Sequence, residues 1–298
     1  FCKERKYTVE HLSQFVQNEF SIVEANEFVS TLNLPIKPRD YQIDAFAWAV
    51  RNDRSLLLSP TASGKSLIIY LLTRYYNKKT LIIVPTTSLV HQMTSDFKDY
   101  GLNSDKHVHK IFTGQEKQEN KQIYISTWQS IYKLPKQWFK QFDCIIGDEA
   151  HLFKSKSLVA ILTKLSDCKY RFGFTGTLDG SQTHRLVLEG LFGKVKKVTT
   201  TSELIEQKHL SDFKIKCIVL QYSDQAKEFC KTMDYQSEIE YIVKNTARNK
   251  FIKNLALSLK GNTLILFQYV EKHGKELYQK INDSTDKHTV HFIHGKVD

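Results

Sequence analysis

Cysteine is scarce in this chain, and no two cysteines have the spacing of a metal site or a disulfide scaffold. The five that occur are widely scattered: Cys2, Cys144, Cys168, Cys217 and Cys230. The lack of a C-x-x-C pair excludes the common zinc-binding modules and a small disulfide-stapled fold. Because free, scattered thiols are typical of reducing compartments, the pattern predicts an intracellular protein.

Long apolar runs are also missing. No stretch approaches the ~18 consecutive apolar residues of a membrane-spanning helix, and no signal-peptide pattern is present. We therefore expect no membrane association and a cytoplasmic location, which would be the host cytoplasm for a viral protein. What remains is 298 residues with 41% apolar content, enough for two domains with substantial cores.

Acidic residues are fewer than basic ones. Lys and Arg total 43 against 32 Asp and Glu, which gives a formal net charge of +11. A surplus of this size suits a polyanionic partner such as nucleic acid. Charge alone fits a merely soluble basic protein equally well, so the motifs must decide between the two.

A phosphate-binding loop is the most informative feature present. Leu56–Leu58 predicts a short strand, and Gly64-Lys65-Ser66 opens an apolar run that predicts a helix. In a strand–loop–helix of this type, backbone amides and the helix N-terminus hold the phosphates of a nucleotide. We expect Lys65 to reach the β- and γ-phosphates and Ser66 to bind Mg²⁺. The predicted nucleotide-binding residues of the loop are Pro60, Thr61, Ala62, Ser63, Gly64, Lys65 and Ser66.

One position departs from the consensus G-x-x-x-x-G-K-[ST], because Ser59 stands where the first glycine is expected. An ordinary surface turn with a chance Gly-Lys-Ser is the alternative reading. A second motif favours the phosphate loop, since the two motifs together are expected in one architecture.

That second motif is a pair of adjacent carboxylates. Residues 142–147 predict a buried parallel strand, and Asp148 and Glu149 follow it directly. Ligands of doubly wound sheets bind at the carboxyl ends of the strands. We expect Asp148 to hold Mg²⁺, Glu149 to polarise the attacking water, and Lys65 to complete the catalytic set. His151 either relays the state of the γ-phosphate or is an ordinary loop histidine.

Strands and helices alternate from Pro38 onward. This alternation predicts an α/β fold with a doubly wound parallel sheet. A second series begins near Phe213, with one helix predicted over about 225–260. The predicted strands are 56–58, 80–84, 108–112, 122–126, 142–147 and 170–174 in the first series, and 214–221, 263–267 and 290–293 in the second.

Three regions follow from this reading. Residues 1–34 form a helical N-terminal segment, either the end of an accessory nucleic-acid-binding domain or a packing extension. Residues 35–211 form the nucleotide-binding domain, and residues 212–298 form part of a second, similar domain. The chain begins at Phe1 and stops at Asp298, just after a predicted strand, so we expect a fragment of a longer protein.

These motifs resemble those of the superfamily 2 helicases, from about Lys37 to the C-terminus. The resemblance implies RecA-like domains of the P-loop NTPase class, with ATP and Mg²⁺ as cofactors. Arg39-Asp40-Tyr41-Gln42 resembles the adenine-reading motif, in which Gln42 would pair with adenine N6 and N7. The alternative for Gln42 is a surface residue at the start of a helix.

Further motifs that grip a nucleic-acid strand are carried over by the same resemblance. The implied contacts are Thr86, Thr87, Thr113, Gly114, Ser126, Thr127 and Trp128. Thr86 also suits the N-cap of a helix, and Trp128 is more readily a packed tryptophan than a base-stacking one. Thr175 and Thr177, with His151, would couple the nucleotide site to the strand site, although an ordinary strand-end turn fits these threonines too.

Within the superfamily, the pattern is similar to branch-migration and restriction-type translocases. It implies an ATP-dependent DNA helicase that moves 3′ to 5′ and remodels branched DNA (junctions, forks, D-loops and R-loops) in recombination, replication and repair. Its partners would be single-stranded and branched DNA, with RNA–DNA hybrids as a further substrate. We expect it to act as a monomer.

Two other readings stay open. One is a DEAH-type RNA helicase, which shares Asp148–His151, although Tyr41-Gln42 and residues 199–210 favour the DNA enzymes. The other is a nucleotide- and DNA-binding module without turnover. Helicase motifs V and VI, which bring charge-stabilising arginines, are not found before Asp298. We therefore expect weak ATP hydrolysis from these residues alone.

Overall fold

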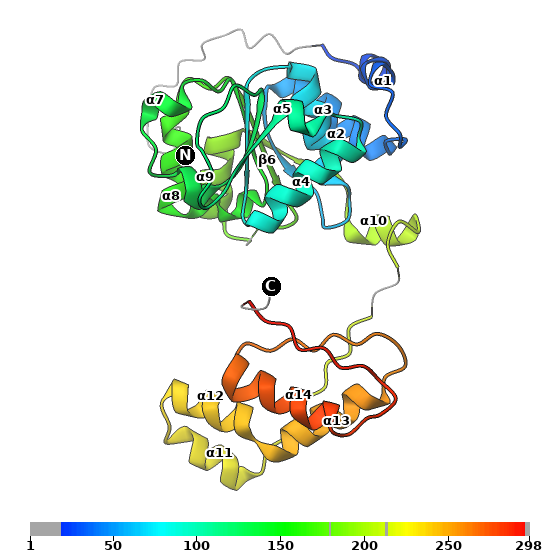
Figure 1. Ribbon diagram of the computed structural model, residues 1–298, viewed down its shortest axis with the longest axis vertical. Coiled ribbons are helices and arrows are strands. Elements are labelled where there is room, and N and C mark those ends of the chain that lie inside the picture. The colour runs from blue at the N-terminus through cyan, green and yellow to red at the C-terminus, as the bar shows by residue number, and fades with distance from the viewer. Residues whose placement is uncertain (1–18, 179, 212–213, 296–298) are drawn as a thin grey trace. The chain divides into compact units, whose positions relative to one another are not determined.

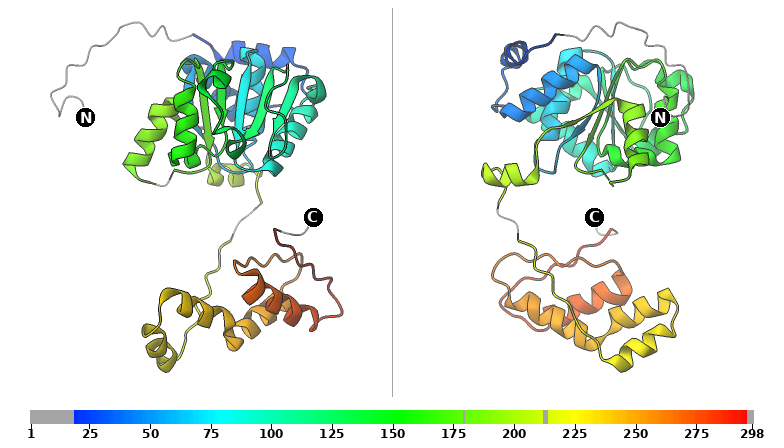
Figure 2. Two further views of the ribbon diagram at one scale, coloured as in Figure 1. Left: turned by 60° about the vertical axis from the view of Figure 1, so that its left-hand side comes forward. Right: turned by 180° about the vertical axis from the view of Figure 1, so that it is seen from behind.

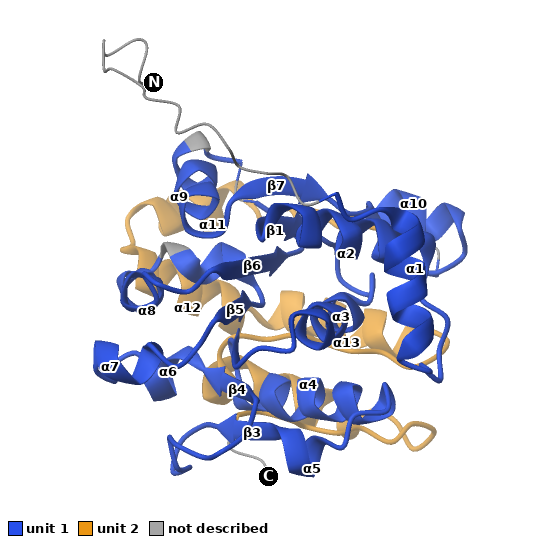
Figure 3. Ribbon diagram, turned by 90° about the horizontal axis from the view of Figure 1, so that it is seen from above, with its two compact units in different colours: residues 1–213 blue, residues 214–298 orange. Residues whose placement is uncertain are grey.

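The computed structural model describes residues 19–178, 180–211 and 214–295. The chain divides into two compact units, residues 1–213 and residues 214–298 (Figure 3). Residues 1–18 of the predicted N-terminal segment lie outside the described residues. In the described part of the chain, no helix is both long and apolar enough to cross a membrane.

A seven-stranded, all-parallel sheet forms the centre of the first unit, with the order β3-β4-β2-β5-β6-β1-β7. This confirms the predicted α/β class with a RecA-like parallel sheet. In this order β6 lies between β1, which precedes the phosphate loop, and β5, which precedes the two carboxylates. The strands are β1 (Arg54–Leu58), β2 (Thr80–Val84), β3 (Val108–Ile111), β4 (Ile123–Thr127), β5 (Cys144–Gly147), β6 (Tyr170–Thr175) and β7 (Lys194–Lys197).

Helices cover both faces of this sheet (Figure 1). One face carries α2 (Asp40–Asn52), α3 (Lys65–Tyr76), α4 (Thr87–Asp99) and α5 (Ser104–His107). The other carries α6 (Trp128–Ile131), α7 (Lys136–Phe139), α8 (Lys156–Lys164) and α9 (Gln182–Phe192). The two views of Figure 2 show the same layers from other directions.

Each face of the sheet has its own buried core. Side chains alternate along a strand, so Leu57 of β1 belongs to the core under α2–α4, and its neighbour Leu56 belongs to the core under α6–α9. Ile82 and Leu81 of β2 divide in the same way. Both cores therefore hold the carboxyl ends of the strands in fixed positions.

The helix α1 (Ile22–Thr31) is part of the first unit. Ser21 and Glu24 form a capping box at its start. Phe28 stacks on Phe46 of α2, with ring centroids 5.7 Å apart, and Phe20 contacts the same ring. The described part of the N-terminal segment thus packs on the sheet domain. The short helix α10 (Thr201–Glu206) follows β7.

Strand β7 was not among the predicted strands. It pairs with β1 at the edge of the sheet, and its sequence is Lys-Val-Lys-Lys. Lysines are a common protection of an edge strand, and they leave only one apolar residue for a pattern to reveal. Its strand character comes from its neighbour rather than from its own composition.

The second unit is described through its helices, which are α11 (Asp224–Lys231), α12 (Tyr235–Lys244), α13 (Thr246–Ser258), a π-helical turn (Val270–Gly274) and α14 (Lys275–Asn282). The single predicted helix over about 225–260 is wrong. Asp234 and Asn245 interrupt it, because each side chain caps the helix that follows: Asp234 accepts from the Ser237 amide, and Asn245 from the Arg248 amide.

The three strands predicted for the second unit are also wrong for its described residues. Residues 214–221, 263–267 and 290–293 form no hydrogen-bonded ladder. Leu264 and Leu266 are 83% and 84% exposed. A strand needs a partner for its backbone N–H and C=O groups, and none pairs with these segments in the part of the chain that the structure describes.

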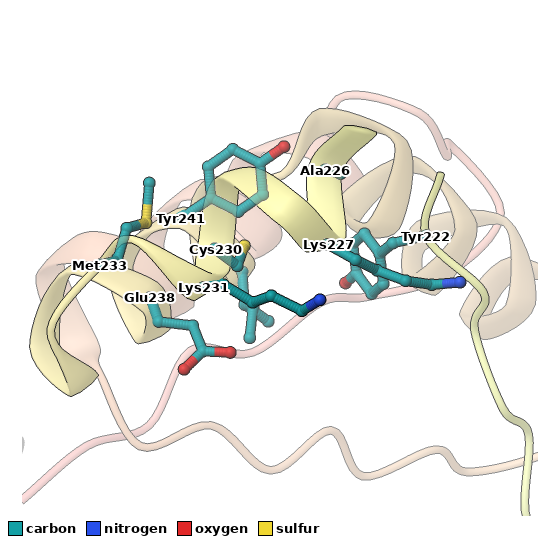
Figure 4. Close-up of a pocket in the computed structure, with 9 residues that line it drawn as sticks. Tyr222, Ala226, Lys227, Cys230, Lys231, Met233, Glu238 and Tyr241 are labelled. Atoms are coloured by element: carbon teal, nitrogen blue, oxygen red, sulfur yellow. The ribbon is translucent and has the colours of Figure 1, made fainter. Parts of the chain in front are cut away.

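A pocket of about 400 Å³ lies beside α11 and α12. Figure 4 shows it with Lys227 and Lys231 on one helix and Tyr241 on the next. It belongs entirely to the second unit, whereas the residues predicted to bind nucleotide belong to the first.

Candidate nucleotide-binding site

The phosphate loop joins the end of β1 to the first turn of α3, as predicted. Gly64 is the N-cap of α3 and has a left-handed backbone, with φ at 76°. A Cβ atom at this position would lie 2.4 Å from Gln42 Nε2. Glycine is therefore required here by both conformation and space.

Ser59 occupies the place of the first consensus glycine, and its hydroxyl has a use within the loop. Ser59 Oγ lies 2.6 Å from Ser63 Oγ, and Ser63 Oγ donates to the Pro60 carbonyl at 2.6 Å. Because the Ser63 proton is committed to Pro60, Ser59 is the donor of the first bond. Both serines are fully buried, so their hydrogen bond stabilises the conformation of the loop.

The three predicted catalytic residues lie together. Asp148 and Glu149 follow β5, and the Asp148 amide still bonds to Ile83 of β2 at 2.9 Å. The Lys65 ammonium donates to Glu149 Oε1 at 2.8 Å and lies 3.8 Å from Asp148 Oδ1. Glu149 has a left-handed backbone, with φ at 49°, which turns the chain sharply after the strand.

Asp148 is a buried carboxylate that lacks full compensation. Only 8% of the residue is exposed, and this burial raises the pKa of its carboxyl, while the Lys65 charge opposes the rise. Its Oδ1 accepts from the Glu149 amide at 3.0 Å. A cation beside Asp148 would therefore be stabilising.

The oxygen atoms of Asp148 and Ser66 fit magnesium. Among the described residues there is no cluster of three His, Cys, Asp or Glu that would hold a metal by protein ligands alone. Magnesium does not need one, because it commonly uses one or two carboxylates with substrate phosphates and water. Ser66 and Asp148 would hold it at the loop.

The three residues predicted to couple the sites are joined by hydrogen bonds. His151 Nδ1 lies 3.0 Å from Thr175 Oγ1, and the Thr175 hydroxyl donates to the Thr177 carbonyl at 2.9 Å. His151 Nδ1 is also 3.4 Å from Glu149 Oε2. The end of β6 is therefore in direct contact with the turn that carries the carboxylates, which suits the relay interpretation of His151.

His184 of α9 is a site residue that no motif indicated. Its Nε2 lies 3.1 Å from the backbone carbonyl of His151, so α9 contacts the carboxylate turn from outside. The residue is buried. Its position after Thr175-Gly176-Thr177 was the only signal in the sequence, and a single histidine near a helix start is too common to interpret.

The side chain of Gln42 is bonded within the protein, beside the phosphate loop. It is 4% exposed, and its Nε2 donates to the carbonyls of Ser63 at 3.0 Å and Gly64 at 3.3 Å. Its Oε1 accepts from the Arg39 amide at 2.8 Å. The amide that was expected to read adenine is thus engaged in supporting the phosphate loop.

The residues predicted to contact nucleic acid divide into two groups. Thr86, Thr87, Thr113 and Gly114 are exposed, and they follow β2 and β3 at the sheet edge that carries the phosphate loop. Thr86 also caps α4, because its hydroxyl accepts from the Leu89 amide at 3.3 Å. These four residues are accessible to a nucleic-acid strand.

The second group lies inside the domain. Ser126 is fully buried, and Thr127 is nearly so. The Ser126 hydroxyl donates to the Thr127 carbonyl at 2.9 Å, and Thr127 Oγ1 lies 2.9 Å from Ser130 Oγ. Trp128 is half-buried and packs edge-on against Tyr132, with centroids 5.9 Å apart. Ser126 and Thr127 are thus engaged with partners inside the protein, and Trp128 packs on Tyr132; their contacts with nucleic acid stay predictions.

Comparison with known proteins places this site in a family. The family described as "Type III restriction enzyme, res subunit" matches residues 35–180. The chain is similar to the protein named ATP-dependent DNA helicase uvsW of Enterobacteria phage T4, with 38% identity over 95% of this chain and 59% of that protein. It is also similar to the DNA 3′-5′ translocase XPB2 of Sulfurisphaera tokodaii, with 25% identity over 72% of this chain and 48% of that protein.

The crystal structure of the UvsW helicase from bacteriophage T4 gives a TM-score of 0.60 at 36% identity, over 66% of this chain and 74% of that chain. The present chain spans about three fifths of the length of the curated phage T4 relative. Sequence and structure thus agree, and the chain belongs to the superfamily 2 helicases, in the group that includes UvsW.

Proposed function

We propose that the protein is an ATP-dependent DNA helicase of the UvsW type and that its first unit is the ATP-binding motor domain. The observation that carries this proposal is the meeting of Lys65, Asp148 and Glu149 at the carboxyl edge of the parallel sheet, with Lys65 2.8 Å from Glu149 and 3.8 Å from Asp148. These are the groups that phosphoryl transfer to water requires.

Each side chain has a defined task in this proposal. The loop amides and the N-terminus of α3 bind the phosphates, and Lys65 moves from Glu149 to the β- and γ-phosphates. Glu149, once released, orients the attacking water. Ser66 and Asp148 would hold Mg²⁺, which would neutralise negative charge on the phosphates. Lys65 thus keeps Glu149 paired until a nucleotide draws the ammonium away.

Coupling to DNA would pass through β6. Thr175 contacts His151, and its backbone carbonyl accepts from the Ser59 amide of the phosphate loop at 2.8 Å. Binding or loss of the γ-phosphate would therefore affect the end of β6 through two hydrogen bonds of Thr175, one to His151 and one to Ser59. Residues 212–298 would form part of a second RecA-like domain, although their described part contains helices and no strand. ATP would then have to bind the closed pair of domains better than the open pair.

The exposed residues Thr86, Thr87, Thr113 and Gly114 are the proposed strand contacts. Hydroxyl and backbone groups of this kind contact phosphates, which carry no base sequence. Recognition would then follow DNA structure, so that branched forms such as forks, junctions, D-loops and R-loops are the proposed substrates. With a net charge of +11, binding should weaken steeply as salt concentration rises.

The test is activation of ATP turnover by different nucleic acids. We expect forked DNA to activate more than linear duplex, and RNA to activate least, with a Lys65→Ala variant as the inactive control. Stronger activation by RNA would favour the DEAH-type RNA helicase. Fork binding should be measured alongside turnover. Tight fork binding with no turnover would favour a nucleotide- and DNA-binding module.

A further inference from the structure

We propose that Tyr100 is a positioning residue that orients the Ser66 hydroxyl toward its metal, an inference that rests on the proposed function. Tyr100 OH and Ser66 Oγ lie 2.9 Å apart and share a hydrogen bond. Ser66 is the second residue of α3, and Tyr100 is the C-cap of α4. The two helices lie side by side on one face of the sheet (Figure 3).

The backbone of Tyr100 is fixed by the way α4 ends. The Leu102 amide donates to the Phe97 carbonyl at 3.0 Å, and the Gly101 amide donates to the Lys98 carbonyl at 2.9 Å. Gly101 has a φ of +92°. These two bonds and the glycine form a Schellman motif, which closes a helix in a single conformation. Tyr100 lies at its centre and has little freedom to move.

The ring of Tyr100 is held as firmly as its backbone. Its centroid lies 5.4 Å from that of Tyr70, and Tyr70 in turn lies 5.3 Å from Phe97. A tyrosine hydroxyl is neutral near pH 7, and burial raises the pKa of the Tyr100 phenol further. The phenol is therefore a fixed, uncharged hydrogen-bond partner on a packed aromatic cluster.

The chemistry of Ser66 explains why such a partner matters. A serine hydroxyl has one proton and two lone pairs and can rotate among three staggered positions. The bond to Tyr100 selects one of them. Whichever oxygen donates, at least one lone pair of Ser66 Oγ is left for a metal. Fixing a ligand by a second residue raises metal affinity, because less rotational freedom is lost on binding.

The experiment measures how strongly Mg²⁺ increases nucleotide affinity. A fluorescent N-methylanthraniloyl-ADP is titrated into the protein with Mg²⁺ and again with EDTA. Tyr100→Phe keeps the ring and removes the hydroxyl, and we expect the Mg²⁺-dependent gain to fall roughly tenfold, the lower end for loss of a ligand's hydrogen-bond partner. Affinity in EDTA should not change.

Tyr70→Phe is the matched control. Tyr70 belongs to the same aromatic cluster, but its hydroxyl accepts from Arg74 at 2.9 Å and not from Ser66. The Tyr70→Phe variant should show the same Mg²⁺-dependent increase in nucleotide affinity as the unmodified protein. An equal loss in both variants would overturn the proposal, because it would show a general effect of the cluster.

Ser66→Ala separates this proposal from the proposed function. If Tyr100 acts through Ser66, adding Tyr100→Phe to Ser66→Ala should cause no further loss. If Ser66→Ala lowers the Mg²⁺-dependent gain and Tyr100→Phe does not, the positioning role is refuted while the metal site stands. If Ser66→Ala itself has no effect, the assignment of Ser66 as a metal ligand is wrong, and the inference fails with it.

Discussion

Two short apolar stretches of this chain, β4 and residues 263–267, differ in structure: the first is a strand and the second is not. All five residues of β4 are buried, and the strand pairs with β2 on one side and β3 on the other. Residues 263–267 form no strand, and Leu264 is 83% exposed. An apolar, strand-like sequence therefore forms a strand only where neighbouring strands pair with its backbone and helices cover its side chains.

The same contrast holds for the two units as wholes. The first unit surrounds its sheet with two cores, and it fixes Lys65, Asp148 and Glu149 within hydrogen-bond and ion-pair distance. The second unit has few buried apolar residues among those described, including Val243, Leu277 and Ile281. The proposed function therefore assigns nucleotide chemistry to the first unit.

Replacement of Lys65 by alanine should have the largest effect. It removes the ammonium that reaches the phosphates, so we expect ATP turnover to be lost and nucleotide affinity to fall. The matched control is Lys231→Ala in the second unit, where Lys231 pairs with Glu228 on an exposed surface. Steady-state ATP hydrolysis and nucleotide titration compare the two. Equal losses in both variants would contradict the division of roles.

Replacement of Glu149 by glutamine should separate binding from cleavage. Turnover should fall by roughly 10²-fold or more, the scale for loss of a positioned general base. ATP affinity should be kept or increase, because Lys65 loses its 2.8 Å partner and is free for the phosphates. Single-turnover hydrolysis and equilibrium binding measure the two effects. Weakened ATP binding would argue for another role of Glu149.

A pair of leucine-to-alanine changes compares a buried side chain of the first unit with an exposed side chain of the second. Leu57 of β1 is fully buried, so Leu57→Ala should lower the free energy of unfolding of the first unit by ~2–5 kcal/mol. Leu264→Ala removes an exposed side chain and should change stability by no more than ~0.5 kcal/mol. Denaturant unfolding measures both. A large loss from Leu264→Ala would show that this side chain is buried in solution.

The smallest expected effect is a gain in stability from Asp148→Asn. Burial raises the pKa of the Asp148 carboxyl above its ordinary value of 3.8, so the folded protein binds this proton more tightly than the unfolded chain. As pH rises from the pKa of Asp148 in the unfolded chain to its higher pKa in the folded protein, the free energy of unfolding therefore falls. The asparagine variant should have a higher melting temperature at pH 7, and the gain should shrink toward pH 4. A lower melting temperature at pH 7 would contradict the burial argument.

Much of the fold and the centre of the site followed from local pattern. Short apolar runs, such as Leu56–Leu58 ahead of the loop that ends in Gly64-Lys65-Ser66 and residues 144–147 directly before Asp148-Glu149, are signals that parallel sheets impose directly. Ser59, Tyr100 and His184 were not predicted as site residues. Tyr100 and His184 bond to partners that are more than 30 residues away in the sequence, and the partner of Ser59 depends on how the loop folds, so no motif in a single sequence indicates these contacts.

Tertiary context decides which partners some of the predicted site residues find in this structure. Ser126 and Thr127 have the residue types of a phosphate-contacting motif, yet both are buried at the end of β4. Gln42 has the right place for an adenine reader, yet its amide is bonded to the phosphate loop. Residue type predicts what a side chain can bond to, and burial decides which partner it finds.

The most direct test of the account is a crystal structure of the protein with Mg²⁺ and a non-hydrolysable ATP analogue. We expect Lys65 Nζ to leave Glu149 and contact the β- and γ-phosphates, with the metal between Ser66 Oγ and Asp148. A nucleotide bound elsewhere, or an analogue in the loop with Lys65 still paired to Glu149, would contradict the account.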